Sequence, residues 1–260
     1  MNGDPNISVN IQDLTVAYGQ QLALRISRLT VPAERITAVI GPNGSGKSTL
    51  LDAVAGLVTP VAGGVEVFGR PPAVARRHVA YVLQNTNPNE VVPLTVNEVV
   101  AMGRYASLGT FRPLRSRDRH AVKRAMQRLA IDSLGRRHLT ELSGGQRQRV
   151  YVAQALAQEA DLLLLDEAGS GLDLPTKERM AEILVEERDA GRTVMYTTHD
   201  VGEAAEADMV VLLAREVVAA GTAEAVLNTS NLAATYGAPI HLAGAGTVVL
   251  ADSRHPHHSA

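Results

Sequence analysis

The sequence has no cysteine and no tryptophan, and aromatic residues make up only 3% of its 260 residues. Without thiols, the chain cannot form disulfides, thiolate metal sites or a cysteine nucleophile, and this fits a reducing compartment. With so few aromatic rings, we expect a hydrophobic core built mainly from Val, Leu, Ile and Ala side chains.

Long apolar runs and a large net charge are also missing. No stretch approaches the roughly 20 apolar residues that a membrane helix needs, and residues 1–11 are too polar for a signal peptide. The formal net charge of −2 argues against nucleic-acid binding governed by overall charge. We therefore expect a soluble or peripheral protein of the cytoplasm, built as one large domain or one domain with a subdomain.

The clearest pattern that is present is G-P-N-G-S-G-K-S at residues 41–48, which fits a phosphate-binding loop. Glycines let the backbone N–H groups turn toward an anion, and a helix beginning near Gly46 adds its positive dipole end. Lys47 would neutralise the β- and γ-phosphates of a nucleotide, and the Ser48 hydroxyl would bind Mg²⁺. An apolar run before the loop and a glycine-ended helix after it support this interpretation.

Strand and helix patterns alternate along the chain. We expect strands at 7–18, 21–29, 35–40, 65–68, 78–83, 161–166, 192–198, 209–213 and 216–220, and helices at 48–56, 95–105, 116–130, 143–158, 175–190 and 222–227. This alternation predicts an α/β fold with a mainly parallel central sheet, antiparallel strands near the N-terminus and an inserted helical segment.

The helical segment is rich in arginine, at positions 104, 112, 115, 117, 119, 124, 128, 136 and 137. Two interpretations stay open. The arginines form either a solvated face or a face held near anionic lipid headgroups or an acidic partner.

Two further patterns lie downstream of the phosphate loop. The run L-S-G-G-Q at residues 142–146 opens a helix, and four leucines at 162–165 are followed by Asp166 and Glu167. A continuous apolar run predicts a central parallel strand, and carboxylates at its carboxyl end lie where such sheets bind ligands. With the phosphate loop, these patterns resemble the ATP-binding cassette (ABC) family, the nucleotide-binding subunits of membrane transporters. The resemblance covers residues 7–227 in order and spacing.

The resemblance implies a set of site residues. Those that bind ATP are Tyr18, Gly41, Pro42, Asn43, Gly44, Ser45, Gly46, Lys47, Ser48, Thr49, Ser143, Gly144, Gly145, Gln146 and Asp173; those that act in catalysis are Lys47, Gln84, Glu167 and His199; those that bind Mg²⁺ are Ser48, Gln84 and Asp166. Tyr18 would stack on the adenine, although by local sequence alone it is more often a strand-end tyrosine.

The implied chemistry is consistent with hydrolysis of ATP. Hydrolysis needs charge stabilisation at the γ-phosphate, an oriented water and a base. Lys47, Mg²⁺ and His199 would stabilise the charge at the γ-phosphate. Glu167 and Gln84 would provide the base and orient the water. In the family, the 142–146 signature of one subunit closes on ATP held by another. One copy of each half-site therefore implies an inert monomer and a sandwich of two copies, or of a pair with a related cassette.

One departure from the family lies just after the implied base. Family members often carry Pro-Thr where this chain has Ala168 and Gly169. We expect this change to loosen the backbone after Glu167 and to affect the turnover rate and the timing of dimerisation.

Residues 94–105, Gly109 and residues 111–114 resemble the helical part of metal importers of the zinc and manganese type. Three histidines in the segment 255–258, with His241 upstream, suit Zn²⁺, but the sequence favours a polar chain end or a cloning remnant over a zinc site. The resemblance thus implies a subunit that powers import of zinc or manganese with a membrane permease and, indirectly, an extracytoplasmic solute-binding protein.

The implied location is the cytoplasmic face of the cell membrane. Residues 1–230 would form the ATP-binding domain, with a helical subdomain at about 90–157, and residues 231–260 a C-terminal extension. We expect the permease to contact Gln84 and the arginine-rich segment, and we expect no nucleic-acid partner.

Other functions remain open. A siderophore or cobalamin importer, or another ABC transporter such as an exporter, would differ in its membrane partner. A DNA-repair or translation ATPase is a different class, but the stretch between the phosphate loop and the signature has no sustained heptads, and the chain has only one cassette. A regulator that binds nucleotide without hydrolysis is disfavoured because Glu167 and His199 are both present.

Overall fold

The computed structural model describes residues 6–84, 93–108, 113–169, 171–237, 240–243 and 247–250. Expectations for Gly109, Phe111, Arg112 and the histidines at 255–258 lie outside these residues, as does the side chain of His241.

A six-stranded sheet forms the centre of the fold, in the order β5-β6-β7-β3-β8-β9. Its strands are β5 (Val79–Val82), β6 (Leu162–Asp166), β7 (Thr193–Thr198), β3 (Ile36–Ile40), β8 (Met209–Leu213) and β9 (Val217–Gly221). All neighbours pair in parallel except β8 and β9. This confirms the predicted α/β fold with a mainly parallel sheet.

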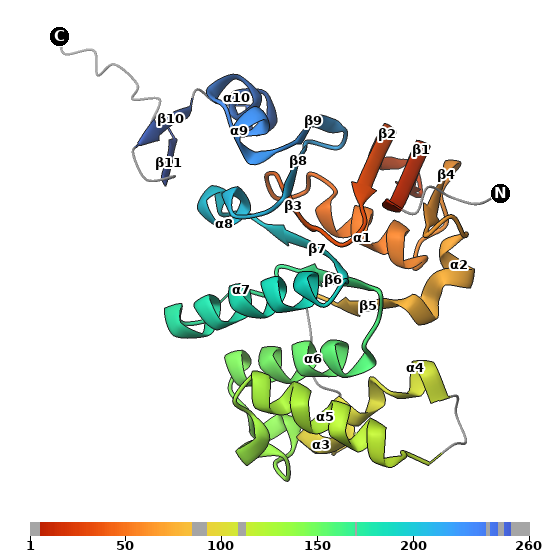
Figure 1. Cartoon of the computed structure of the whole chain (residues 1–260). Coiled ribbons are helices and arrows are strands. Elements are labelled where there is room, and N and C mark those ends of the chain that lie inside the picture. Colours follow the sequence, from red (N-terminus) through yellow and green to blue (C-terminus); the bar gives the residue numbers. More distant parts are fainter. Residues whose placement is uncertain are drawn as a thin grey trace.

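A separate antiparallel sheet, in the order β2-β1-β4, packs beside the central one (Figure 1). Its strands are β1 (Ile7–Tyr18), β2 (Gln21–Pro32) and β4 (Ala62–Val67). Tyr18 pairs with Gln21 across a turn in which Gly19 takes φ 60°, a left-handed value that glycine adopts at little cost.

Helices cover both faces of the central sheet. On one face lie α1 (Lys47–Ala55) and the antiparallel sheet; the helices beyond the other face are α3 (Val96–Met102), α4 (Tyr105–Leu108), α5 (Ser116–Arg128), α6 (Gly144–Gln158) and α7 (Leu174–Asp189). The leucines of β6 alternate between the two cores, with Leu162 and Leu164 facing α1 and Leu163 and Leu165 facing the opposite side. Burial on both faces explains why the strand is a continuous apolar run.

The remaining elements are short. They are α2 (Pro72–Ala75), α8 (Val201–Ala205), α9 (Ala223–Val226), α10 (Thr229–Tyr236), β10 (Ile240–Ala243), β11 (Thr247–Leu250) and 3₁₀ turns at Arg76–His78, Asp132–Leu134 and Leu139–Glu141. The sequence patterns did not predict α2, α8, α10 or the β10–β11 hairpin. The single helix expected at 95–105 is interrupted after Met102, where a Cβ on Gly103 would lie 2.1 Å from the Gln154 carbonyl oxygen of α6.

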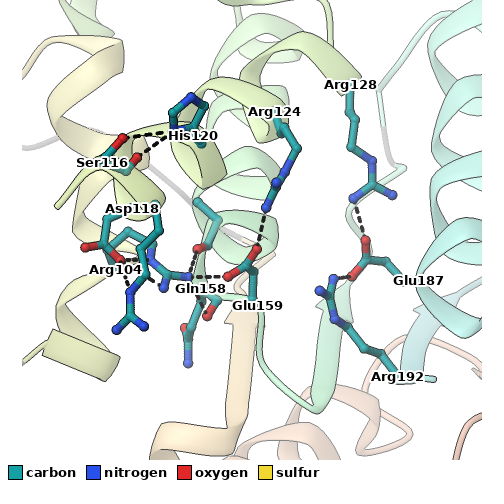
Figure 2. Close-up of polar contacts among 12 residues, drawn as sticks. Arg104, Ser116, Asp118, His120, Arg124, Arg128, Gln158, Glu159, Glu187 and Arg192 are labelled. Atoms are coloured by element: carbon teal, nitrogen blue, oxygen red, sulfur yellow. Dashed lines mark hydrogen bonds and ion pairs between the residues drawn. The ribbon is translucent and has the colours of Figure 1, made fainter. Parts of the chain in front are cut away.

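Both interpretations of the arginine-rich segment are wrong for Arg104, which is buried rather than on a surface. Its guanidinium is 3.1 Å from the carboxylate of buried Asp118 and 2.8 Å from that of Glu159 (Figure 2). Arg124 binds the other oxygen of Glu159 at 2.8 Å. These arginines therefore join the helices of this layer to one another.

None of the helices within the described ranges combines the length and the apolar character that a membrane span requires.

Candidate functional site

The phosphate loop links the carboxyl end of β3 to the first turn of α1. A Cβ on Gly41 would lie 2.0 Å from the Leu213 carbonyl oxygen, so only glycine fits there. Gly46 precedes α1 with φ 98°, a left-handed value, and α1 begins without a side-chain cap. The helix begins where the sequence predicted it, and no side chain caps its first amide groups, an arrangement that suits an anion. Gly44 and Asn43 are exposed, and the buried Ser45 Oγ has no hydrogen-bond partner among the described residues.

The Lys47 side chain is buried and turns back into its own loop. Its Nζ donates to the carbonyl oxygens of Gly41, at 2.9 Å, and Pro42, at 3.3 Å. Nζ also lies 3.8 Å from Glu167 Oε1. Burial lowers the pKa of Lys47, and the charges of Glu167 and Asp166 partly oppose this effect. A phosphate bound in the loop would favour the ammonium form and compete for its hydrogen bonds.

Glu167 lies at the centre of the polar groups beyond β6. Its Oε2 accepts a hydrogen bond of 2.7 Å from Gln84 Nε2, and its Oε1 faces Lys47. Glu167 itself has φ 48°, a left-handed value that is rare for a non-glycine residue, whereas neither Ala168 nor Gly169 has a positive φ. The left-handed backbone conformation is therefore at Glu167 itself and not at Ala168 or Gly169.

Thr197 on β7 joins the two carboxylates and was not singled out from the sequence. Its Oγ1 donates to Asp166 Oδ1 at 2.6 Å and accepts from the backbone N–H of Glu167 at 2.9 Å. Asp166 is buried, and its carboxylate is held by this bond. The parallel pairing of Asp166 with Thr197 brings the two side chains together, and the only sequence signal was a hydroxyl residue near the end of the predicted strand.

His199 follows β7 and is exposed at the edge of a hollow of about 1000 Å³. Glu167 and α7 line the same hollow. The next residue, Asp200, caps α8 by accepting a 2.7 Å hydrogen bond from the Gly202 N–H, which fixes the chain just after His199.

Further predicted nucleotide residues belong to other elements. Tyr18 is 54% exposed at the end of β1, and Asp173 precedes α7 with a carboxylate that caps no N–H of that helix. Ser143 and Gln146 form a capping box at the start of α6, in which each side chain binds the other's backbone N–H. Helix α6 packs on one face of the central sheet, and α1 packs on the other face. The signature, at the start of α6, and the phosphate loop, before α1, therefore belong to opposite layers.

The donor set is suited to magnesium. Ser48 would offer a hydroxyl, Gln84 an amide oxygen and buried Asp166 a carboxylate, and hard divalent cations prefer such oxygen ligands. The fit rests on this chemistry, and Gln84 lies 2.7 Å from Glu167, the residue that follows Asp166 in the chain.

These features define a class of protein. A parallel sheet, a glycine loop at a strand's carboxyl end, an uncapped helix start and a buried lysine together form the site of a phosphate-binding-loop nucleotide-binding protein.

Comparison with known proteins narrows the class. The family model for ABC transporters matches residues 24–170. The zinc transport system ATP-binding protein TroB of Treponema pallidum (strain Nichols) is 39% identical over 90% of this chain and 88% of its own length. The manganese transport system ATP-binding protein MntB of Listeria innocua is 35% identical over 90% of this chain and 99% of its own length.

A solved structure gives the same result. One chain of a metal-chelate type ABC transporter in an inward-facing conformation superposes with a TM-score of 0.78 and 29% identity, over 95% of this chain and 98% of that one. The protein therefore belongs to the ABC transporter family, as the sequence resemblance implied. It is an ATP-binding subunit, an ATPase that couples hydrolysis to membrane transport.

Proposed function

We propose that this subunit hydrolyses Mg-ATP to power the import of zinc or manganese, with a membrane permease and, outside the membrane, a solute-binding protein. The observation that supports the hydrolytic site is the approach of Lys47, Gln84 and Glu167 to one another. The metal substrate is supported by the names of the relatives, which act in zinc and manganese transport. The proposed location is the cytoplasmic face of the membrane, and the proposed domain bounds are those expected from the sequence.

In this proposal, the loop amides and Lys47 bind the phosphates, and Tyr18 stacks on the adenine. Ser48, Gln84 and Asp166 would hold Mg²⁺, which supplies charge neutralisation at the β- and γ-phosphates when it is bound.

Glu167 takes a proton from the attacking water, and the amide of Gln84 orients both the carboxylate and the water. His199 donates a hydrogen bond to the γ-phosphate. Lys47 Nζ lies 3.8 Å from Glu167 Oε1, so phosphates bound in the loop would compete for the lysine and leave the carboxylate free to act as a base.

The proposal requires two subunits at each site. The signature and the phosphate loop lie in opposite layers of one chain, which supports completion of the site by Ser143 and its neighbours from a second cassette. Asp173 would lie at this interface. A closed pair of identical chains, or of this chain and a relative, would hold two ATP molecules.

Glu167→Gln tests the proposed base. The amide keeps the shape and the contact with Gln84 but cannot accept the proton, so we expect ATP binding and ATP-dependent dimerisation to persist while hydrolysis falls about 100-fold or more. Glu178→Gln is the matched control, because Glu178 is an exposed residue that lines the same hollow. Near-normal phosphate release from Glu167→Gln would remove Glu167 from the role of base.

The transported species is tested in the assembled complex. With permease and binding protein in proteoliposomes, Zn²⁺ or Mn²⁺ should drive ATP-dependent uptake. A response to a chelated iron ligand, with none to either metal ion, would overturn the substrate and favour the siderophore-type alternative.

A further inference from the structure

A hydrogen bond outside the proposed site joins the two elements that carry its metal ligands. Tyr81 on β5 donates its hydroxyl hydrogen to Asp52 Oδ1 on α1 at 3.1 Å. Asp52 lies four residues after Ser48, about one helical turn further along α1. Tyr81 lies three residues before Gln84. The bond therefore spans from the helix that presents Ser48 to the strand that leads to Gln84.

The pleat of the sheet places this bond beside Asp166. Tyr81 pairs with Leu164, and both side chains belong to the core on the α1 face. Because side chains alternate along a strand, Asp166 projects from the same face as Leu164. On one side of Asp166 lies β7, where Thr197 Oγ1 donates a hydrogen bond to Asp166 Oδ1 at 2.6 Å. On the other side lies β5, where Tyr81 is placed diagonally to Asp166.

The surroundings of Asp52 disfavour the charged form of its carboxyl group. Burial raises the pKa of Asp52, and the charge of Asp166 adds to this effect, whereas the hydrogen bond from Tyr81 opposes it. Burial also raises the pKa of Tyr81, with the Asp166 and Asp52 charges contributing, so the hydroxyl stays protonated and remains a donor. The Tyr81 hydroxyl therefore holds in place a carboxyl group on which the charge of Asp166 acts.

We propose that the Tyr81–Asp52 hydrogen bond is a positioning contact that sets the spacing between Ser48 and Gln84 for the bound cation. The inference rests on the proposed Mg-ATP site. Tyr81 and Asp52 contact neither nucleotide nor cation. They act through α1 and β5, and they keep the Asp52 carboxylate turned toward the tyrosine rather than toward Asp166.

Three variants separate the hydrogen bond from the charge. Tyr81→Phe and Asp52→Ala remove the bond, whereas Asp52→Asn keeps an oxygen that accepts it. A typical hydrogen bond contributes about 1 kcal/mol, or about fivefold in an equilibrium constant. Isothermal titration calorimetry measures ATP affinity with and without Mg²⁺. Without Mg²⁺, we expect Tyr81→Phe and Asp52→Ala to bind ATP as tightly as wild type. With Mg²⁺, the increase in ATP affinity should be about fivefold smaller in these variants than in wild type.

The Mg²⁺ dependence of ATP hydrolysis provides a second measurement. The Mg²⁺ concentration for half-maximal hydrolysis should rise by about the same factor in both variants and stay near the wild-type value in Asp52→Asn. Tyr236→Phe is the matched control, because its buried hydroxyl has no hydrogen-bond partner among the described residues. It should change neither measurement.

The outcomes are distinguishable. If the wild-type chain binds no ATP with Mg²⁺, the proposed function fails. If it binds and Tyr81→Phe keeps the full Mg²⁺ effect, the positioning role alone is wrong. The role is also wrong if Asp52→Asn loses as much as Asp52→Ala, since the charge rather than the bond would then matter. If Tyr81→Phe does not fold, the two Asp52 variants carry the test.

Discussion

Replacing Glu187 on α7 with glutamine should cost more stability than any surface substitution on the same helix. Its carboxylate is only 4% exposed and accepts hydrogen bonds from Arg128 Nη1, at 2.5 Å, and from Arg192 Nη1 (Figure 2). Arg128 belongs to α5, and Arg192 immediately precedes β7, so this one carboxylate ties the helical layer to the central sheet.

The size of the effect follows from burial. Glutamine keeps the shape but removes the charge, which leaves two guanidinium groups facing a neutral amide. Removal of one partner from a buried ion pair costs about 3–5 kcal/mol, and we expect the lower end because both arginine side chains keep 24% exposure. For a chain of this size, about 3 kcal/mol corresponds to a fall of roughly 6–12 °C in melting temperature.

Thermal unfolding followed by circular dichroism measures the difference, with Glu182→Gln as the matched control. Glu182 lies on the same helix and pairs with Arg179 at 2.8 Å, but its side chain is 65% exposed. Its loss should change stability by at most about 1 kcal/mol. The double variant Glu187→Gln, Arg192→Gln should recover part of the loss because one unpaired cation is gone. Equal, small shifts for Glu187→Gln and Glu182→Gln would refute the reasoning.

Two further predictions concern protons. Burial lowers the pKa of Lys47, and a bound triphosphate would raise it again, so ATP binding at about pH 9 should take up protons. Calorimetry should show a binding enthalpy that depends on the buffer for wild type but not for Lys47→Arg; equal enthalpies in all buffers for wild type would contradict this. The Arg115 N–H and the Arg104 guanidinium hold the pKa of Asp118 below its ordinary 3.8, against the effect of desolvation. Its stabilisation is therefore complete above about pH 4 and lost as the pH falls through the folded-state pKa. Asp118→Asn should lose stability at pH 7 and show a flatter acid-unfolding curve by circular dichroism, and an unchanged curve would contradict this.

The parts of the fold that the sequence predicted are those set by local chemistry. The glycines around Lys47 restrict the loop to one kind of turn, and the structure has the left-handed angle at Gly46 and the close approach at Gly41. The run of leucines before Asp166 is a strand because it is buried on both faces. Both patterns can be recognised from neighbouring residues, although the contact that restricts Gly41 comes from Leu213 on β8 and the burial of the leucines comes from packing on both faces of the sheet.

The expectations that failed depended on distant contacts. Arg104 looked like a surface residue because its partner Glu159 is far away in sequence and reaches it only when α6 packs beside α4. The helix expected through Gly103 is interrupted where the chain meets the Gln154 carbonyl group. Charge and periodicity alone carry no information about such approaches.

The amino-acid order by itself determined that this chain has a phosphate loop, a carboxylate strand and the signature of an ABC ATPase, because spacing along the backbone fixes those turns and strand ends. Only the tertiary structure decided that Thr197 joins the two carboxylates, that Tyr81 meets Asp52, and that Glu187 lies between two arginines. The reason is physical: hydrogen bonds act over about 3 Å, and strand pairing and helix packing decide which distant side chains come within that reach.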